Sequence, residues 1–420
     1  MPHALSQTEL LSPAGSFESL MAAIKGGADS VYFGVGKLNM RARSAKNFGL
    51  ADLPEITRIC QEHHLKSYLA LNTILYDDEL EDMRSLCAAA REAGVSAVIV
   101  SDVSAIQAVR EADLPVHMST QTNISNISAV KFYAQFADVM VLARELTIEQ
   151  VRSIVDEIRQ QDIRGPNGNL VGIELFVHGA LCVSVSGKCY MSLANTGHSA
   201  NRGDCFQTCR RSYRVTDETT GEELVIDNKF VMSPRDLCTI RFMDVLVNSG
   251  ARVFKIEGRG RREDYVYHVT RAYKQAIDAV KDGTFTRDGA IELERELETV
   301  FNRGFWHGGY YMGQHWDDWS ASYGSRATKQ KVYLGMVTNY FPKAGIAEFV
   351  IETGELAVGE TLMITGPTTG YLEFNAPDLY VNDAPAEVAR QGDKPTIPVP
   401  EKVRRNDKLF KLVDRVDYQK

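Results

Sequence analysis

The sequence predicts an α/β fold: a (β/α)8 TIM-like barrel with a cysteine-bearing insertion, followed by a small C-terminal antiparallel β-barrel domain. Over the first two thirds of the chain, short apolar runs alternate with amphipathic helical stretches. After Lys331 the pattern changes to alternating strand-like runs separated by glycine- and proline-bearing turns. The 420 residues are also enough for two cores. We therefore expect the catalytic barrel at residues 1–328 and the second domain at residues 329–420.

Eight short runs have the features of buried parallel strands. Each is rich in β-branched or aromatic residues and is bounded by glycine, proline or polar residues. Helical patterns separate most of them, which favours a barrel over a doubly wound sheet. The gap before the eighth run is longer and predicts one extra strand at 229–233. The eight runs are 9–13, 30–34, 67–72, 97–101, 116–120, 138–143, 173–179 and 253–258. The main helical stretches are 17–28, 53–64, 80–94, 103–112, 127–136, 148–161, 265–283 and 291–301.

The overall charge limits the classes of partner. A formal net charge of −8 argues against a protein that coats nucleic acid indiscriminately, but it allows a local basic patch that binds one folded RNA. The N-terminus lacks the pattern of a signal peptide, and no apolar run reaches the length of a membrane span. We expect a soluble, cytoplasmic protein with no membrane partner, and the sequence leaves open whether it forms a homo-oligomer.

The seven cysteines divide into two groups. Cys60 and Cys87 stand alone in helical patterns, where a cysteine is usually a small core residue. Disulfides are not expected in a reducing cytosol, so the remaining cysteines need another explanation. The remaining five fall within one stretch of the chain: Cys182, Cys189, Cys205, Cys209 and Cys238.

The first four of these five cysteines predict a thiolate metal site on a loop at about residues 180–215. Thiolate-rich sites select zinc or iron–sulfur clusters. Only Cys205 and Cys209 have the tight spacing that is typical of structural zinc, and four thiolates from separate loop positions suit a [4Fe–4S] cluster equally well. The cysteine spacing alone does not distinguish a zinc site from an iron–sulfur cluster. Cys238 is an alternate ligand or a buried structural cysteine.

Polar residues at the carboxyl ends of the expected strands predict an active site there, because barrel enzymes place their chemistry at that end. His117 and Gln121 belong to the fifth strand and its following turn, and Glu174 and His178 to the seventh. We expect His117, Glu174 and His178 to be the catalytic candidates. Neighbouring polar residues in the same positions are Asn72, Ser119, Arg144 and Glu145.

The eighth strand adds a charged stripe. Lys255, Glu257 and Arg259 alternate with other residues and are expected to share one face. Such charges are costly in an apolar strand unless they are paired, so an internal ion network is one interpretation. Ligand binding is the favoured one, because Gly258 and Gly260 allow close approach and the two cations suit a dicarboxylate or a phosphate. We assign Lys255, Glu257 and Arg259, together with Gln121, to binding a small co-substrate.

Three segments are basic in a chain that is acidic overall. They are residues 202–214, 252–262 and the last twenty residues. Runs of this kind are most often solvated faces. Two of them, however, flank the cysteine loop and the eighth strand, which would also suit an RNA backbone held beside the active site.

A long motif from Glu174 through His178, Cys182 and Cys189 to Ser192 resembles the signature of the collagenase-like peptidase family U32. The β-rich tail also resembles the C-terminal domain of that family. Further matches lie at 10–15, 27–34, 119–123, 201–210, 233–237 and 255–259.

In layout the chain is most similar to family members of about this length that act as prephenate-dependent tRNA uridine hydroxylases. This resemblance implies oxygen-independent hydroxylation of the wobble uridine of tRNA to 5-hydroxyuridine, with prephenate required and a [4Fe–4S] cluster, and it favours that cluster over zinc. Carried over to this sequence, the ligands are Cys182, Cys189, Cys205 and Cys209. Some relatives use a later cysteine as the fourth ligand, which keeps Cys238 as the alternate.

Two other functions follow from the same features. The family's older name implies a peptidase, although the sequence has no HExxH or GxSxG motif and no cysteine that is clearly free beside a histidine. Glu174 is the carboxylate that could serve such an enzyme as a base. The third possibility is a non-catalytic RNA-binding protein whose cluster is only structural.

Overall fold

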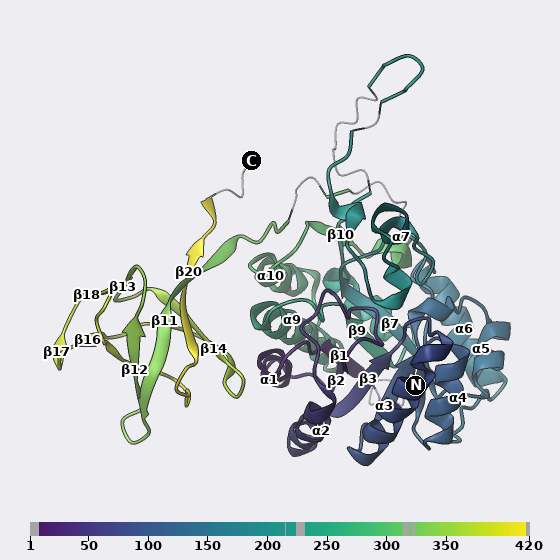
Figure 1. The fold of residues 1–420 in the computed structure, drawn as a ribbon, viewed down its shortest axis with the longest axis horizontal. Coiled ribbons are helices and arrows are strands. Elements are labelled where there is room, and N and C mark those ends of the chain that lie inside the picture. Colours follow the sequence, from purple (N-terminus) through teal and green to yellow (C-terminus); the bar gives the residue numbers. More distant parts are fainter. Residues whose placement is uncertain (1–7, 215, 224–231, 314–318, 321–323, 417–420) are drawn as a thin grey trace.

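The computed structural model describes residues 8–214, 216–223, 232–313, 319–320 and 324–416. A ring of parallel strands carries helices on its outside, and a smaller β domain lies against one side of this barrel (Figure 1). The predicted fold class is confirmed. None of the helices in these ranges is long and apolar enough to cross a membrane.

The ring closes because its last strand pairs with both its first and its seventh. Phe254 lies opposite Leu10 on one side and opposite Leu175 on the other, and both pairings are parallel. The strands are β1 (Glu9–Pro13), β2 (Ser30–Gly34), β3 (Lys66–Leu71), β4 (Ala97–Val100), β5 (Val116–Met118), β6 (Val139–Val141), β7 (Gly172–Gly179) and β9 (Val253–Ile256). Side chains of alternate residues fill the interior of the ring, and the apolar ones form a small cluster: Leu11, Tyr32, Tyr68, Ala97, Ile99, Val139 and Val253.

The helices cover the outside of the ring with their apolar faces, and the largest core lies between the two layers. Their starts follow from local chemistry: the Thr147 and Gln150 side chains form a capping box at the start of α6, for example. The helices are α1 (Phe17–Lys25), α2 (Leu53–Glu62), α3 (Leu80–Glu92), α4 (Val103–Glu111), α5 (Ile127–Tyr133), α6 (Ile148–Gln160), α8 (Met243–Val247), α9 (Glu263–Lys281) and α10 (Arg287–Glu298).

Two short strands extend the sheet beyond the ring. β8 (Asp236–Cys238) pairs antiparallel with the end of β7, and β10 (Phe305–His307) pairs parallel with β8. The extra strand expected at 229–233 falls largely on residues 229–231, which are outside the described residues, and Met232 and Ser233 are not in a strand. β8 begins three residues later than that expected strand ends.

The C-terminal domain is an antiparallel sheet with its own apolar core, as predicted. Its first strand begins at Lys329. The division into residues 1–328 and 329–420 stays a prediction. Strands pair in the order β15–β14–β20–β11–β12–β19–β16–β17, and β13 pairs with β18. Their bounds are β11 (Lys329–Phe341), β12 (Ile346–Ile351), β13 (Glu355–Ala357), β14 (Thr361–Gly366), β15 (Gly370–Asn375), β16 (Tyr380–Val381), β17 (Ala384–Pro385), β18 (Val388–Arg390), β19 (Thr396–Pro398) and β20 (Lys408–Asp414).

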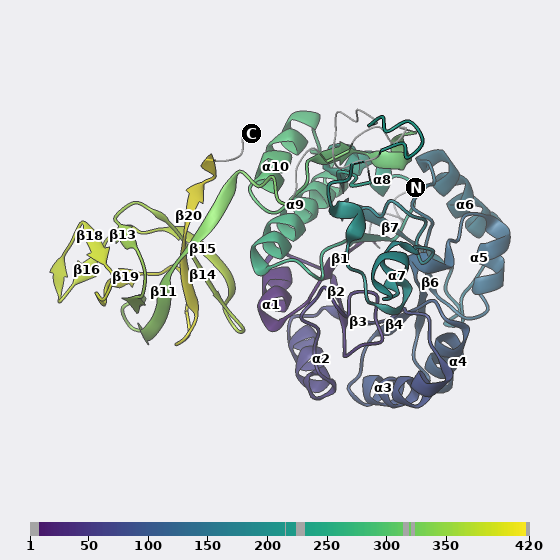
Figure 2. The same cartoon turned by 45° about the horizontal axis from the view of Figure 1, so that its top comes forward.

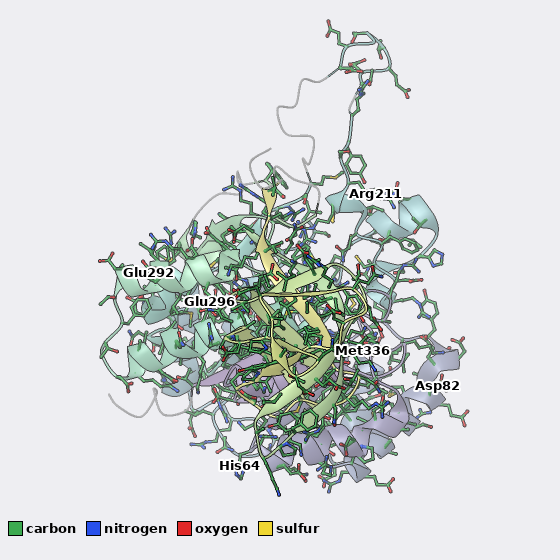
Figure 3. All side chains as sticks on the ribbon, turned by 90° about the vertical axis from the view of Figure 1, so that its left-hand side faces the viewer. His64, Asp82, Arg211, Glu292, Glu296 and Met336 are labelled. Carbon is green, nitrogen blue, oxygen red and sulfur yellow. The ribbon has the colours of Figure 1, made fainter. Side chains whose placement is uncertain are left out.

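The two domains meet where β15 packs on α1 and α9. Gly370 has a φ of +68°, and a Cβ there would lie 2.6 Å from the Cβ of Met21, so glycine is required for this approach. The Tyr267 and Tyr371 rings stack with their centroids 4.7 Å apart. Figure 3 looks onto this β domain, with Met336 on β11 in front of the barrel and Glu296 on α10 beside it.

Candidate functional site

A pocket lies at the carboxyl ends of the barrel strands, and the cysteine-bearing segment covers it. In Figure 2 the short helix α7 (Met191–Thr196), which belongs to this segment, lies over the centre of the ring of strands. We call the cavity beneath it the mouth pocket. Apart from the cysteines, its polar and aromatic lining residues are Tyr32, Arg41, Ser44, Asn72, Ser119, Thr120, Gln121, Arg144, Phe176, Ser184, Ser186, Asn201, Gln207, Arg210, Lys255, Glu257, Arg259, Arg261 and Arg303.

Glycine residues hold the cysteine-bearing segment against the barrel loops. Gly203 has a φ of +87°, and a Cβ there would lie 2.5 Å from the carbonyl oxygen of Asn39. A Cβ on Gly187, whose φ is +70°, would lie 2.9 Å from the Cβ of Gln121. Asn123 Nδ2 then donates a hydrogen bond of 3.0 Å to the Ser186 carbonyl. The segment is therefore packed onto the mouth of the barrel at both of its ends.

Cys182, Cys189, Cys205 and Cys209 all line the mouth pocket. All four are free thiols, with Cys182 exposed and the other three partly buried. Burial raises the pKa of the Cys209 thiol to about 11 and also raises that of Cys189. In the part of the chain that the structure describes, no three His, Cys, Asp or Glu side chains converge closely enough to hold a single metal ion. The four thiols thus face one cavity, but they are not placed to coordinate a single metal ion.

This donor set fits an iron–sulfur cluster. Four thiols that no disulfide occupies face one cavity, and thiolates are the usual ligands of such clusters. Arg41 also lies close enough for Cys182 and Cys205 to contribute to raising its pKa, after the larger contribution of Glu257. A cation at this position would offset the negative charge that four thiolates bring.

Cys238, the alternate ligand, lies elsewhere. It is fully buried on β8, its Sγ is 3.8 Å from the Tyr273 hydroxyl, and burial raises its pKa to about 12. It does not line the mouth pocket.

The lining of the mouth pocket is strongly cationic. Glu257 is its one acidic member within the described residues, against seven basic side chains. Those seven are Arg41, Arg144, Arg210, Lys255, Arg259, Arg261 and Arg303. A lining of this charge suits a ligand that carries more than one negative charge.

Arg259 is the most deeply buried of the seven basic side chains. It is 4% exposed, and burial lowers its pKa to about 10. Its Nη1 donates a 3.0 Å hydrogen bond to Asn39 Oδ1, and no carboxylate forms an ion pair with it in the described ranges. A Cβ on Gly34 would lie 2.4 Å from the same Nη1, so the glycine makes room for the guanidinium. Four of the five guanidinium N–H donors are not used by this hydrogen bond.

Glu257 is paired instead with Arg41, whose Nε donates to Glu257 Oε1 at 3.0 Å. Burial opposes ionisation of this carboxyl, but Arg41 and then Arg144 outweigh it and lower the pKa of Glu257. The two residues come from the loop after β2 and the loop after β9. Their ion pair therefore connects the loop after the second barrel strand to the loop after the last one, at one wall of the mouth pocket.

Lys255 lines the floor of the pocket, and the fully buried Glu174 lies beneath it, outside the lining. Lys255 Nζ donates to Glu174 Oε1 at 2.8 Å, and Glu174 Oε2 is buried without a hydrogen-bond partner. Burial raises the pKa of Glu174, and Lys255 only partly counteracts this effect. Gln121 lies higher, where its Oε1 accepts a 3.3 Å hydrogen bond from Asn72.

The two strand histidines lie outside the mouth pocket. His117 packs against the Tyr68 ring inside the barrel, its Nδ1 has no partner, and burial lowers its pKa to about 3. His178 lies near Tyr273, with its Nδ1 3.3 Å from that hydroxyl, and burial lowers its pKa to about 4. The pocket thus brings together the four cysteines, Gln121 and the Lys255–Glu257–Arg259 stripe, with Glu174 beneath Lys255. The catalytic roles expected of His117, His178 and Glu174 stay predictions.

Some residues at the site were missed at the sequence level because they come from loops with no strand pattern. Arg41, which lines the pocket, and Asn39, the buried partner of Arg259, lie in the loop after β2, where a local concentration of basic residues was the available signal. Arg144 was noted at the end of the sixth strand without a role. Its Nε is buried without a partner, and its guanidinium lies 4.8 Å from the centre of the Phe176 ring.

The outer rim of the mouth combines cations with aromatic rings. The Arg43 guanidinium lies 3.6 Å from the centre of the Phe206 ring, and that of Arg202 lies 3.5 Å from the Tyr76 ring. Tyr190, which follows Cys189 directly, is 70% exposed. Proteins that bind single-stranded RNA use exposed rings and guanidinium planes of this kind to stack on bases.

Comparison with known proteins agrees with this picture. Residues 15–320 match the sequence pattern of peptidase family U32. A protein of Porphyromonas gingivalis named collagenase is 52% identical over 97% of this chain and 98% of its own length. The 23S rRNA 5-hydroxycytidine C2501 synthase of Escherichia coli is 37% identical over 70% of this chain and 44% of its own length. The tRNA hydroxylation protein P of Escherichia coli is 27% identical over 96% of each chain. The chain is thus a member of peptidase family U32, which includes nucleic-acid hydroxylation proteins.

Proposed function

We propose that this chain hydroxylates the wobble uridine of tRNA to 5-hydroxyuridine without molecular oxygen, and that it requires prephenate and a [4Fe–4S] cluster. The observation that carries the proposal is the mouth pocket, in which four free thiols face seven basic side chains. Relatives named for tRNA and rRNA hydroxylation support the class of reaction.

Within this proposal, Cys182, Cys189, Cys205 and Cys209 hold the cluster. An iron–sulfur cluster bound there supplies one-electron redox chemistry beside the pocket. Arg259 and Lys255 bind the two carboxylates of prephenate, because a guanidinium with unused donors suits a carboxylate. Glu257 holds Arg41 toward the thiols, and Gln121 orients the small acid.

The RNA base enters from the rim, where exposed Tyr190 and the Arg43–Phe206 and Arg202–Tyr76 stacks lie. A uridine that is taken out of its stack can rest on such surfaces at a cost of a few kcal/mol. The buried lining then excludes bulk water from the base and from the small acid.

The deciding experiment reconstitutes the reaction under anaerobic conditions. Purified protein is loaded with iron and sulfide and is then incubated with unmodified tRNA, prephenate and a chemical electron acceptor. The acceptor is needed because exchange of the C5 hydrogen for a hydroxyl group from water is a two-electron oxidation. The nucleosides are then analysed by mass spectrometry. The expected result is 5-hydroxyuridine that depends on both iron and prephenate. Absence of iron from loaded protein, or unchanged nucleosides with fully loaded protein, would overturn the proposal.

A collagenase-like peptidase is the second candidate, because the Porphyromonas gingivalis relative carries that name. Hydrolysis needs an activated nucleophile or a metal-bound water. His117 and His178 lie outside the mouth pocket with lowered pKa values, and neither forms a hydrogen bond to a thiol in the described ranges. Gelatin cleavage by cluster-free protein would support the peptidase. A non-catalytic RNA-binding protein would instead bind tRNA and leave its nucleosides unaltered.

A further inference from the structure

A second cavity lies between the mouth of the barrel and the C-terminal domain, and we call it the interdomain groove. Its lining combines the start of α1, the loop at Ser44–Lys46, the start of α9 and the β14 and β20 strands of the second domain. Ser44, Arg259, Gly260 and Arg261 line this groove and the mouth pocket alike. The groove therefore adjoins the candidate active site.

The groove has an excess of positive charge. Its basic lining residues are Lys46, Arg259, Arg261, Arg262, Lys331 and Lys408, and its acidic ones are Glu18 and Glu263. Lys331 Nζ lies 3.0 Å from Glu263 Oε1, so that acid is already neutralised. The formal balance of the lining is thus about four positive charges, in a chain whose net charge is −8.

Three of these basic side chains are not neutralised by an acidic partner in the described ranges. Lys46, Arg262 and Lys408 are exposed, and the described part of the chain contains no ion pair for any of them. They come from a barrel loop, from the residue before α9 and from β20, so the fold gathers like charges from three distant segments along one concavity. Like charges that are brought together repel one another, and a polyanion relieves this repulsion.

We infer that the interdomain groove binds the phosphate backbone of the RNA, next to the nucleotide that enters the mouth pocket. This inference rests on the proposed function, since it takes RNA as the substrate. The groove adjoins the pocket at Arg259 and Arg261, as the binding site of a strand that continues beyond the modified nucleotide should. The C-terminal domain then serves as one wall of the RNA site, with Lys408 as its phosphate contact.

The test compares two triple variants of the full-length protein with equal loss of charge. The first is Lys46→Ala/Arg262→Ala/Lys408→Ala. The control is Arg84→Ala/Arg110→Ala/Lys131→Ala, three exposed basic residues on α3, α4 and α5 with no ion pair in the described ranges. Binding of fluorescently labelled tRNA is measured by anisotropy over a series of salt concentrations, with iron content as a check on the mouth pocket.

The groove variant is expected to bind tRNA at least about tenfold more weakly than wild type at moderate salt. Each lost phosphate contact lowers the slope of log K against log salt by about 0.7 to 0.9, so the slope should fall by about 2 to 3. The control variant should bind as wild type does. Equal loss of affinity in both variants, or an unchanged slope in the groove variant, would overturn the inference while the proposed function stands.

Failure of the proposed function gives a different pattern. If the wild-type protein binds no tRNA at any salt concentration, both proposals fall. Binding of polyglutamate in place of tRNA would also overturn the inference, because it would identify an acidic polypeptide as the occupant.

A single charge reversal, Lys408→Glu, provides a second variant at an exposed position and should weaken tRNA binding in the same direction.

Discussion

Lys255 and Glu174 form a buried ion pair at the floor of the mouth pocket, with Nζ and Oε1 2.8 Å apart and both side chains almost fully shielded from solvent. The Lys255 ammonium also lies 4.5 Å from the centre of the Tyr32 ring. The Lys255 ammonium thus contacts Glu174 and Tyr32 within the barrel, and the same residue also lines the pocket. A residue in this position can stabilise the barrel and bind an anion.

Removal of Lys255 should therefore destabilise the fold as well as weaken anion binding. Lys255→Met leaves the Glu174 carboxylate buried without its partner, which costs about 3–5 kcal/mol in the free energy of unfolding. The double variant Lys255→Met/Glu174→Gln should recover most of this loss, because no charge is then left unpaired. Urea denaturation of the two variants and wild type measures the difference. Equal stability of the single and double variants would contradict the ion-pair account.

The ligand set of the cluster can be tested one cysteine at a time. Serine substitution of Cys182, Cys189, Cys205 or Cys209 should remove most of the bound iron and the broad absorbance near ~400 nm from anaerobically loaded protein. Cys238→Ala is the matched control and should keep its iron, because Cys238 lies outside the mouth pocket. Loss of iron on changing Cys238, with iron retained after Cys209→Ser, would exchange the fourth ligand.

Arg259 should determine affinity for the small acid. Arg259→Lys keeps the charge but loses the planar pair of donors that binds a carboxylate, so affinity for prephenate should fall about tenfold or more. Isothermal titration calorimetry with prephenate measures this effect. Arg110→Lys, on the exposed face of α4, is the control and should bind as wild type does. Undiminished affinity in the Arg259 variant would remove this residue from the site.

Stability at the contact between the domains should depend on pH through His268. Its Nδ1 lies 2.7 Å from Glu296, and its Nε2 lies 2.9 Å from the Tyr371 hydroxyl and 3.2 Å from Glu373. Burial alone would lower the pKa of His268, but the two carboxylates outweigh it and raise that pKa. Because the folded pKa is raised, the stabilisation is complete below about pH 6.5 and is lost as pH rises through the folded pKa.

The free energy of unfolding should accordingly fall by up to about 1.4 kcal/mol per pH unit above about pH 6.5, until the folded pKa is passed. Thermal unfolding of wild type and His268→Gln over this range measures the effect, and the variant should lack this part of the pH dependence. His63→Gln, at an exposed position after α2, is the control. Identical pH profiles for wild type and His268→Gln would show that the histidine carries no such linkage.

The sequence was sufficient to predict the barrel because each of its strands is buried on both faces, and such strands read as short apolar runs. It could not predict β8 and β10, which are three residues each and lie outside the regular alternation of strands and helices. That alternation is what identified β5 and β6, which are equally short. The Asn39 and Arg41 side chains were missed for a related reason: their positions depend on contacts with residues more than 160 positions away.

Strand alternation was an incomplete guide to the site. Lys255, Glu257 and Arg259 line a common cavity as expected, but only Lys255 lies on a strand, because β9 ends at Ile256. In β7, regular alternation would place Glu174 and His178 on the same face, but the pairing of β7 with β9 shifts register between Phe176 and His178. A shift of this kind sends the following side chain to another face, and His178 accordingly packs near Tyr273. A register shift of this kind depends on the neighbouring strand, so it could not be predicted from the sequence of β7 alone.

The four thiols of the mouth pocket belong to none of the apolar cores formed by the described residues. The barrel and the β domain therefore gain their stability from side chains other than these four. Protein that lacks the proposed cluster is therefore expected to keep both the barrel and the β domain folded, with a free energy of unfolding close to that of loaded protein.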